Sequence, residues 1–403
     1  MVYSNQLQRN TGIMDPLVFS DSITDSYWWY HGYSTCKNNF IVRKDIYPDT
    51  TGFTFGGKGV WRLPSIADKL GPLQLVFELS NLTATGDTQP SFVDFVGYEI
   101  FERIDLIYST SELYQLFPEE LFERYKRTLT SEQQYSASQL VAGDLTPTER
   151  INLATGTQYI VVDLPLPHTR GTSRWLEIMQ LAVEPRIEIY FRRLSDIANT
   201  TGTNPFATLN NVHLKATFLF VDADERDAIT ARTESEDGII RLFDDYKAEW
   251  LEIPQGSSGE VSLKLNNFRT STKRILFFVR HKTDLTTPLA HNYFNLIPIQ
   301  TWYLEEAGGK IIEPIRSNYN VHYLTPLYHV GLSSDYIYEH TFAISPDDQL
   351  NATGSLNLGN TTNLLLKILL PTGTTADTWV VTVMSHEYNT HQHVRGDLVK
   401  NFK

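Results

Sequence analysis

Two stretches of sequence decide the fold of this chain: residues 159–167, YIVVDLPLP, and residues 212–226, VHLKATFLFVDADER. In both stretches the apolar side chains recur at every second position, which places them on one face of an extended strand. The second stretch ends in an acidic turn, where Asp222 or Asp224 is suited to cap a short helix with Glu225 in its first turn. Both stretches therefore predict half-buried strands of a β-sheet protein.

The same alternation recurs along the rest of the chain. Further runs at this spacing are Leu73–Leu79, Ile187–Phe191, Val261–Leu265 and Trp379–Val383. Two other runs, residues 275–279 and 364–370, are apolar on both faces, which predicts sheets that are covered on both sides. Many short strands between turns rich in Gly, Pro, Asn and Thr indicate antiparallel sandwiches rather than a parallel α/β sheet.

Helical periodicity is scarce. The best candidate is Glu112–Ser131, in which Ser111 is suited to cap the start and Pro118 is expected to break the helix into two pieces. Its apolar stripe consists of Leu113, Leu116, Phe117, Leu121, Phe122 and Tyr125. The sequence thus predicts few, short helices in the loops of a β protein.

The length of 403 residues is enough for two domains of ordinary size. The polar stretch Asp224–Asp237 is the best candidate for a boundary between them. We predict an N-terminal arm at 1–24, a first jelly roll at 25–230 and a second at 231–403, each long enough for eight strands. No direct internal repeat is visible, but two sandwiches need share only the inward–outward pattern.

Charge and composition exclude several classes of function. A formal net charge of -13 repels phosphate, so nucleic acid is not expected as a direct partner. The single cysteine, Cys36, excludes an internal disulfide and points to a reducing compartment. We see neither a signal-peptide pattern nor a run of the ~20 apolar residues that a membrane-spanning helix needs. The chain is therefore expected to fold in the cytoplasm.

Several stretches, taken in order, resemble the double-jelly-roll major capsid proteins of nucleocytoplasmic large DNA viruses and their relatives. The most specific are Leu164–Pro167 and Val221–Arg226. Residues 95–106 are similar to a Gly-centred strand of that family that leads into a local helix. The remaining similar stretches are 53–63, 73–79, 263–268, 273–279, 336–346, 354–357 and 387–389. The chain departs from the family at Tyr108–Ser111, where relatives often have a Gly-Gly-Gln turn, and it is short for the family.

The resemblance implies an all-β fold of two consecutive eight-stranded antiparallel jelly rolls. It also implies a major capsid protein whose homotrimers form pseudo-hexagonal capsomers of an icosahedral virus shell. The partners would be other copies of the chain, neighbouring capsomers, minor capsid or cement proteins, penton proteins and an underlying internal membrane. The protein would be made in the host cytoplasm and reside in the virion. It would not be an enzyme.

Some side-chain groups look like sites. His386, His391 and His393 lack the zinc-protease spacing, although His391 and His393 would share a face of a strand and could bind a metal at a trimer seam. Residues 222–227 have carboxylates but lack the glycine turn and distal acid of a calcium loop. Residues 56–59, GGKG, lack the phosphate-loop spacing. A structural role is the better interpretation of all three.

The N-terminal aromatic cluster Tyr27-Trp28-Trp29-Tyr30-His31 is suited to stacking on sugars or bases, but packing against a neighbour or a core is the better interpretation. Cys36 has no feature of a nucleophile. We therefore predict no catalytic, cofactor-binding or metal-binding residues. Two alternatives stay open: a scaffold or minor capsid protein on the same fold, and a β-sandwich protein that binds or cleaves carbohydrate.

Overall fold

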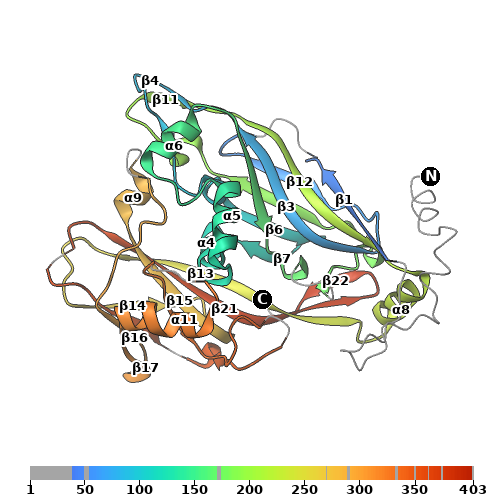
Figure 1. Ribbon diagram of the computed structural model, residues 1–403. Coiled ribbons are helices and arrows are strands. Elements are labelled where there is room, and N and C mark those ends of the chain that lie inside the picture. Colours follow the sequence, from blue (N-terminus) through green and yellow to red (C-terminus); the bar gives the residue numbers. More distant parts are fainter. Residues whose placement is uncertain are drawn as a thin grey trace, which may run out of the picture.

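The computed structural model describes residues 39–49, 54–169, 174–268, 270–287, 291–331, 335–348, 351–361, 363–373 and 375–401. In this part of the chain, four large antiparallel sheets pair into two sandwiches (Figure 1). The predicted arm at 1–24, the aromatic cluster at 27–31 and Cys36 all lie outside the described residues.

The first sandwich is built from two four-stranded sheets. One has the order β1-β12-β3-β8, and the sheet facing it has the order β2-β9-β6-β7. The strands of the first sheet are β1 (Phe40–Ile46), β12 (Leu209–Phe220), β3 (Lys69–Leu79) and β8 (Gln158–Leu164). The strands of the second sheet are β2 (Lys58–Arg62), β9 (Arg186–Phe191), β6 (Phe101–Tyr108) and β7 (Ser111–Leu116).

The second sandwich repeats this plan. Its sheets have the orders β13-β21-β15-β18 and β14-β20-β16-β17. The strands of the first are β13 (Ile239–Ile253), β21 (Trp379–Val394), β15 (Ser271–His281) and β18 (Tyr338–Thr341), extended by β19 (Leu356–Asn357) and β22 (Asp397–Lys400). The strands of the second are β14 (Glu260–Leu265), β20 (Leu364–Leu369), β16 (Thr301–Glu306) and β17 (Gly309–Arg316).

Both sandwiches have the same strand order when the eight long strands of each half are numbered along the chain. One sheet is first-eighth-third-sixth, and the other is second-seventh-fourth-fifth. This order is that of a jelly roll, which consists of two Greek keys. The prediction of two consecutive eight-stranded jelly rolls is confirmed. The repeat lies in topology, which needs only alternating burial, and this explains why no repeat is visible in the sequence.

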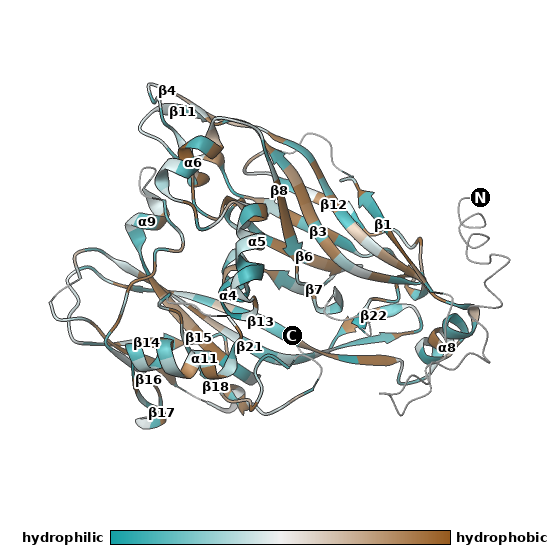
Figure 2. Cartoon of the chain, in the orientation of Figure 1, coloured by the Kyte–Doolittle hydropathy of each residue, from teal (hydrophilic) through white to brown (hydrophobic). Residues whose placement is uncertain are grey.

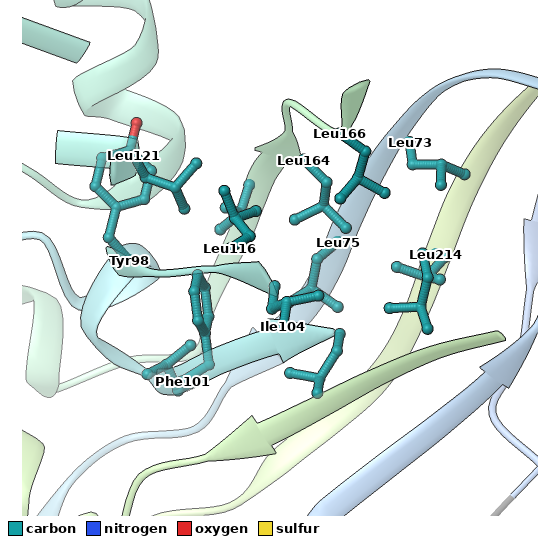
Figure 3. Close-up of a cluster of buried hydrophobic side chains, with 14 of the residues drawn as sticks. Leu73, Leu75, Tyr98, Phe101, Ile104, Leu116, Leu121, Leu164, Leu166 and Leu214 are labelled. Atoms are coloured by element: carbon teal, nitrogen blue, oxygen red, sulfur yellow. The ribbon is translucent and has the colours of Figure 1, made fainter. Parts of the chain in front are cut away.

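Alternating burial produces the core of each sandwich. In β8 the side chains of Ile160, Val162 and Leu164 point inward and are buried, while Tyr159 and Asp163 are exposed. Figure 3 shows Leu73 and Leu75 of β3 and Leu214 of β12 facing Ile104 of β6 and Leu116 of β7. Figure 2 shows the same alternation as brown and teal stretches along β3 and β12.

A second apolar core fills the other sandwich. Its members come from both facing sheets and include Phe277, Trp302, Leu366 and Val381. Phe277 contacts Trp302 edge to face, with ring centroids 5.1 Å apart. Every residue from Thr272 to Arg280 in β15 is buried, because this sheet has the core on one face and the first sandwich on the other. The prediction for 275–279 is therefore confirmed.

The prediction for residues 364–370 is wrong. In β20 the side chains of Leu364, Leu366 and Ile368 are buried, but Leu365 and Leu369 are only half-buried. The sheet that contains β20 has the core on one face alone. The other face of this sheet tolerates Leu365 and Leu369, because half-buried leucine side chains lower the stability of the fold little and single exposed apolar residues are common on protein surfaces.

The chain passes from one sandwich to the other through α8 (Ala223–Glu234). Asp222 caps this helix, and Glu225 lies in its first turn, as the sequence predicted. The predicted boundary at residue 230 falls within α8, and we keep it as a proposal. Asp68 of the first sandwich binds Arg226 through two charge-assisted hydrogen bonds of 2.6 and 3.0 Å, which fix the start of the connection.

The helix predicted at Glu112–Ser131 is half wrong. Residues Ser111–Leu116 form strand β7, which pairs with β6, and Pro118 begins α4 (Pro118–Thr128) instead of breaking a longer helix. Proline suits the first turn of a helix, where its missing N–H would have no partner. The resemblance also placed a strand around Gly97, whereas this glycine lies in the short helix α3 (Val96–Glu99), ahead of β6.

Two further helices, α5 (Ser131–Val141) and α6 (Pro147–Ala154), follow α4 and were not predicted. Both begin with a capping box, formed by Thr130 with Gln133 and by Thr146 with Glu149. Other short helices of the described residues are α7 (Leu194–Ile197), α9 (Lys282–Thr286), α10 (Ser317–Tyr319) and α11 (Thr325–Tyr328), with a π-helical turn at Asn320–Leu324 and 3-10 turns at Pro167–Thr169, Ile178–Gln180 and Leu358–Asn360. Short strands pair β4 (Thr83–Thr85) with β11 (Thr203–Phe206) and β5 (Ser91–Phe92) with β10 (Ala198–Asn199). Among the described residues, no helix is long and apolar enough to cross a bilayer.

Candidate functional site between the two sandwiches

Helix α4 lies between the two sandwiches (Figure 1). Its apolar side chains Leu121, Phe122 and Tyr125 belong to the core of the first sandwich. Its remaining buried side chains are mostly charged: Glu119, Glu120, Glu123 and Arg127. They face a charged set of the second half, Arg274, Arg280, His329, Glu339 and His386. We call these nine residues the joint.

The centre of the joint is Glu339 of β18. Its carboxylate binds the Arg127 guanidinium in an ion pair, lies 2.9 Å from His329 Nε2 and lies 3.5 Å from Arg274. Arg127 also donates to the Ile337 carbonyl at 2.9 Å. A carboxylate in this position is satisfied by cations from both halves of the chain, so the contact fixes one half against the other.

Arg274 connects Glu339 of β18 with Glu123 of α4. Its guanidinium lies 3.1 Å from Glu123 of α4, and Glu123 lies 3.9 Å from His386. His329, in turn, contacts Asp347 through Nδ1 at 3.0 Å. The result is a continuous chain of alternating charges across the contact between the sandwiches.

The charges of the joint shift the pKa values of Glu339 and His329. Burial alone raises the pKa of Glu339, but the positive charges of Arg127, His329 and Arg274 outweigh it and hold that pKa well below its usual range. Burial alone lowers the pKa of His329, but Glu339 and Asp347 outweigh it and raise that pKa. Both directions mean that the network is stable in its charged form.

A second arm of the joint is formed by Arg280 of β15, which is 2% exposed. It donates to Thr382 Oγ1 at 2.7 Å and to the Tyr293 carbonyl at 3.0 Å, and it lies 3.4 Å from Glu119. Burying a guanidinium is costly unless its donors are satisfied, and here backbone, hydroxyl and carboxylate oxygens accept from its two terminal nitrogens.

The long ribbon of β13, β21 and β22 extends this contact beneath the first sandwich. Arg241 of β13 binds both carboxylate oxygens of Glu177, one of them at 2.6 Å. Burial raises the pKa of Glu177, but the neighbouring His393 and the hydrogen-bonded Arg241 guanidinium outweigh it and lower this pKa to about 2. Tyr108 of β6 donates to the Gly396 carbonyl at 2.5 Å. The end of the ribbon that contains Arg241 and the β21–β22 turn is thereby tied to the first sandwich.

The joint holds the two sandwiches in a fixed position relative to each other. Truncating one partner of a buried ion pair is strongly destabilising, so the two sandwiches resist rotation about α4. The carboxylates of Glu119, Glu123 and Glu339 are paired with arginine or histidine within the chain. Among the described residues, no group of three or more His, Cys, Asp or Glu side chains is arranged to hold a metal ion.

The structure places His391 and His393, the two histidines considered as possible metal ligands, in the contact between the sandwiches. His391 stacks on Phe243 with ring centroids 4.0 Å apart, and His393 Nδ1 lies 3.8 Å from Glu177. Burial lowers the pKa of His391 to about 4. His391 and His393 do share a face of β21, but this face contacts the first sandwich of the same chain rather than an open surface.

The other two candidates are also structural. Residues 222–227 form the cap and first turns of α8, where Arg226 binds Asp68. In the glycine-rich stretch, Gly56 and Gly57 form a turn and Lys58 lies in β2, where it contacts Glu188 at 2.9 Å. Arg226 and Lys58 therefore already have carboxylate partners within the fold, and Asp222 is used as a helix cap.

The joint itself is not predicted from the sequence. Charged residues on one side of a helix usually face water, so Glu119, Glu120, Glu123 and Arg127 carry no sign of burial. A weak signal exists in the second half, because β15 places Lys273, Arg274 and Arg280 around a run of apolar residues on both faces. Cations within a doubly covered strand need buried acceptors, and these must come from another element.

The comparisons with known proteins agree with this architecture. No protein-family model matches the chain, and no curated protein sequence matches it. The PBCV-1 virus capsid matches with 13% identity and a TM-score of 0.73, over 93% of this chain and 99% of that chain. The Faustovirus major capsid protein matches with 8% identity and a TM-score of 0.72, over 97% and 96%. The mavirus major capsid protein matches with 9% identity and a TM-score of 0.54, over 95% and 93%.

These structures match over nearly the full length of both chains, so the likeness includes both sandwiches and their connection. The chain therefore has the double-jelly-roll fold that these viral capsid proteins share. At such low sequence identity, the likeness is one of fold.

Proposed function

We propose that this protein is a major capsid protein, the structural subunit of an icosahedral virus shell. The observation that carries the proposal is the identical strand order of the two sandwiches, together with the full-length match to viral capsid structures. The neighbours are structural proteins, and the role that we propose is architectural rather than catalytic.

The proposed building block is a homotrimer. Three chains supply six sandwiches, and six similar sandwiches in a ring give a nearly hexagonal outline that tiles a shell. A closed ring of identical chains uses head-to-tail contacts between two unlike surfaces, which suits a chain with two related but unequal halves. The joint supports this function because a capsomer needs a fixed angle between its sandwiches.

Assembly requires further contacts outside the trimer. We propose that capsomers contact each other, minor capsid or cement proteins and penton proteins, and that they cover an internal membrane. Synthesis and assembly would take place in the host cytoplasm, and the product would be the virion shell. The net charge of -13 disfavours a direct contact with the packaged nucleic acid.

The oligomeric state of the purified full-length protein tests the proposal. Light scattering coupled to gel filtration should give three times the chain mass of 46.1 kDa. A monomer at all concentrations would overturn the proposal. A monomer that also binds glycans on an array would favour the carbohydrate-binding alternative instead.

A further inference from the structure

The helical segment between β17 and β18 exposes an apolar stripe. Tyr319, Tyr323 and Leu327 lie four residues apart, on one side of the continuous helical turns from Ser317 to Tyr328, and they are 51%, 55% and 60% exposed. The Tyr319 and Tyr323 rings stack at a centroid distance of 5.1 Å. We call these three residues the helical patch. Exposed aromatic patches of this kind mark interaction surfaces.

The opposite side of the same segment is firmly anchored. Asn320 donates to the Glu339 carbonyl at 2.6 Å and accepts from the Glu339 N–H at 2.8 Å. Thr325 donates to the Asn320 carbonyl at 3.1 Å. The helical patch is therefore a preorganised surface on a rigid support, attached directly to the joint.

A hollow of about 300 Å³ lies beside the helical patch. Ile311, Ile315, Tyr319 and Tyr328 form part of its lining, so its wall is largely apolar. A hollow next to exposed aromatic side chains is suited to receive an aromatic anchor from a partner.

The chain itself carries a suitable anchor on α5. Tyr135 is 71% exposed, which makes it the most exposed aromatic side chain of the described residues, and Leu140 of the same helix is 46% exposed. The helices that carry the two surfaces, α11 and α5, lie on the same side of the molecule (Figure 1). Gly331, just beyond α11, donates to the Arg127 carbonyl at 2.7 Å near the end of α4, and α5 begins four residues after Arg127.

This placement fits a closed ring of three. Each chain in such a ring occupies a third of the circle around the threefold axis. Its two unlike contact surfaces are therefore both on the side of the chain that faces this axis. A helical patch and an α5 surface on the same broad side of the chain satisfy this requirement. Surfaces on opposite sides would instead favour an open filament.

The helical segment and the α5 surface differ in the balance of their charges. Residues 314–330 contain Arg316 and no acidic residue, and His322 is exposed beside the helical patch, while the exposed carboxylate in the lining of the hollow is that of Glu313. Residues 131–154, which include α5 and α6, contain Glu132, Asp144 and Glu149 against a single base, Arg150. Opposite charges across a contact favour the head-to-tail pairing, while two copies of the acidic surface would repel.

We infer that the helical patch binds the α5 surface of a second copy of this chain, with Tyr135 of that copy in the hollow beside Tyr319. The inference rests on the proposed function, since it assigns the contact that closes the capsomer ring. The partner is a copy of the chain, and the contact is heterologous, so each copy gives Tyr135 to one neighbour and its helical patch to the other.

Two variants of the full-length protein test the inference. One is Tyr135→Ser, and the other is Tyr323→Ser with Leu327→Ser. Both change exposed side chains, so the fold should persist. Each variant should raise the concentration at which half of the trimer dissociates by at least roughly 30-fold, as expected when a central aromatic anchor is lost. Tyr47→Ser, at a residue that is 66% exposed elsewhere on the chain, is the matched control and should leave the trimer intact.

Mixing the two variants distinguishes this contact from a general loss of assembly. Each variant retains the surface that the other lacks, so an equal mixture should form a dimer of twice the chain mass and no closed trimer. Trimers that survive in both variants would overturn the inference but leave the proposed function standing. Variants that dissociate but give no mixed dimer would overturn the head-to-tail pairing. A monomeric wild-type protein would instead overturn the proposed function.

Discussion

Arg127 of α4 and Glu339 of β18 form an ion pair between side chains that are 1% and 3% exposed, across 212 positions of sequence. The pair joins the first sandwich to the second at the centre of the joint. The rest of the joint is arranged around it, because Glu339 also binds His329 and Arg274. This relationship leads to the first prediction.

Replacing Arg127 with methionine should destabilise the protein by about 3 kcal/mol, because it leaves a buried carboxylate with one cation fewer. The double variant Arg127→Met, Glu339→Gln should be less destabilised than the sum of the two single variants by about 1–3 kcal/mol. Urea unfolding followed by tryptophan fluorescence measures all four members of this cycle. Additive single effects would contradict a direct coupling between the two residues.

Glu99 of α3 gives a prediction about pH. Burial raises its pKa to about 7, and Arg192 at 3.3 Å only partly offsets the effect. The pKa of Glu99 in the folded protein is above its ordinary value of 4.5. The contribution of Glu99 to the stability of the fold is therefore fully present below pH 4.5 and is lost as the pH rises toward 7. Glu99→Gln should therefore stabilise the protein by about 1–3 kcal/mol at pH 8 and by nearly nothing at pH 4.5.

Urea midpoints measured between pH 4.5 and pH 8.5 check this prediction. Glu102→Gln is the matched control, because it removes the same charge from an exposed side chain of the next strand. A Glu99→Gln variant that is less stable than the wild type at every pH would show that the ion pair with Arg192 outweighs the cost of burial.

Gly331 gives a prediction about the close approach between the two halves. A Cβ at this position would lie 2.4 Å from the Lys126 carbonyl oxygen and 2.7 Å from that of Arg127. Gly331→Ala should therefore push the loop after α11 away from α4 and cost about 2 kcal/mol, within the range for overpacking. Gly156→Ala is the control, since its Cβ would meet only a side-chain nitrogen of Gln158 at 3.8 Å. Equal midpoints for the two variants in thermal unfolding would contradict this account of the joint.

The sequence predicts the sandwiches better than the contact between them. Alternation such as that of Ile187, Ile189 and Phe191 depends on local geometry, so it identifies a strand and its buried face without any knowledge of neighbours. The segment with Leu113 and Leu116 satisfies helical spacing equally well, and only its pairing with β6 makes it a strand. Local pattern alone could not resolve that ambiguity.

The joint was not predictable from local pattern. The burial of Glu119, Glu123 and Arg127 depends on cations and acceptors more than a hundred residues away. Only tertiary structure brings these groups together. From the sequence alone, their pattern indicates the solvent-exposed side of an amphipathic helix. The helical patch is the converse case, because an apolar stripe on a helix usually indicates burial, whereas here it is exposed.

The central claim is that this chain builds shells from trimers of paired jelly rolls. Cryo-electron microscopy of the purified full-length protein tests it most directly. We predict class averages with three copies around one axis and six density lobes in a nearly hexagonal outline. Particles that contain a single pair of lobes, at every protein concentration, would contradict the claim.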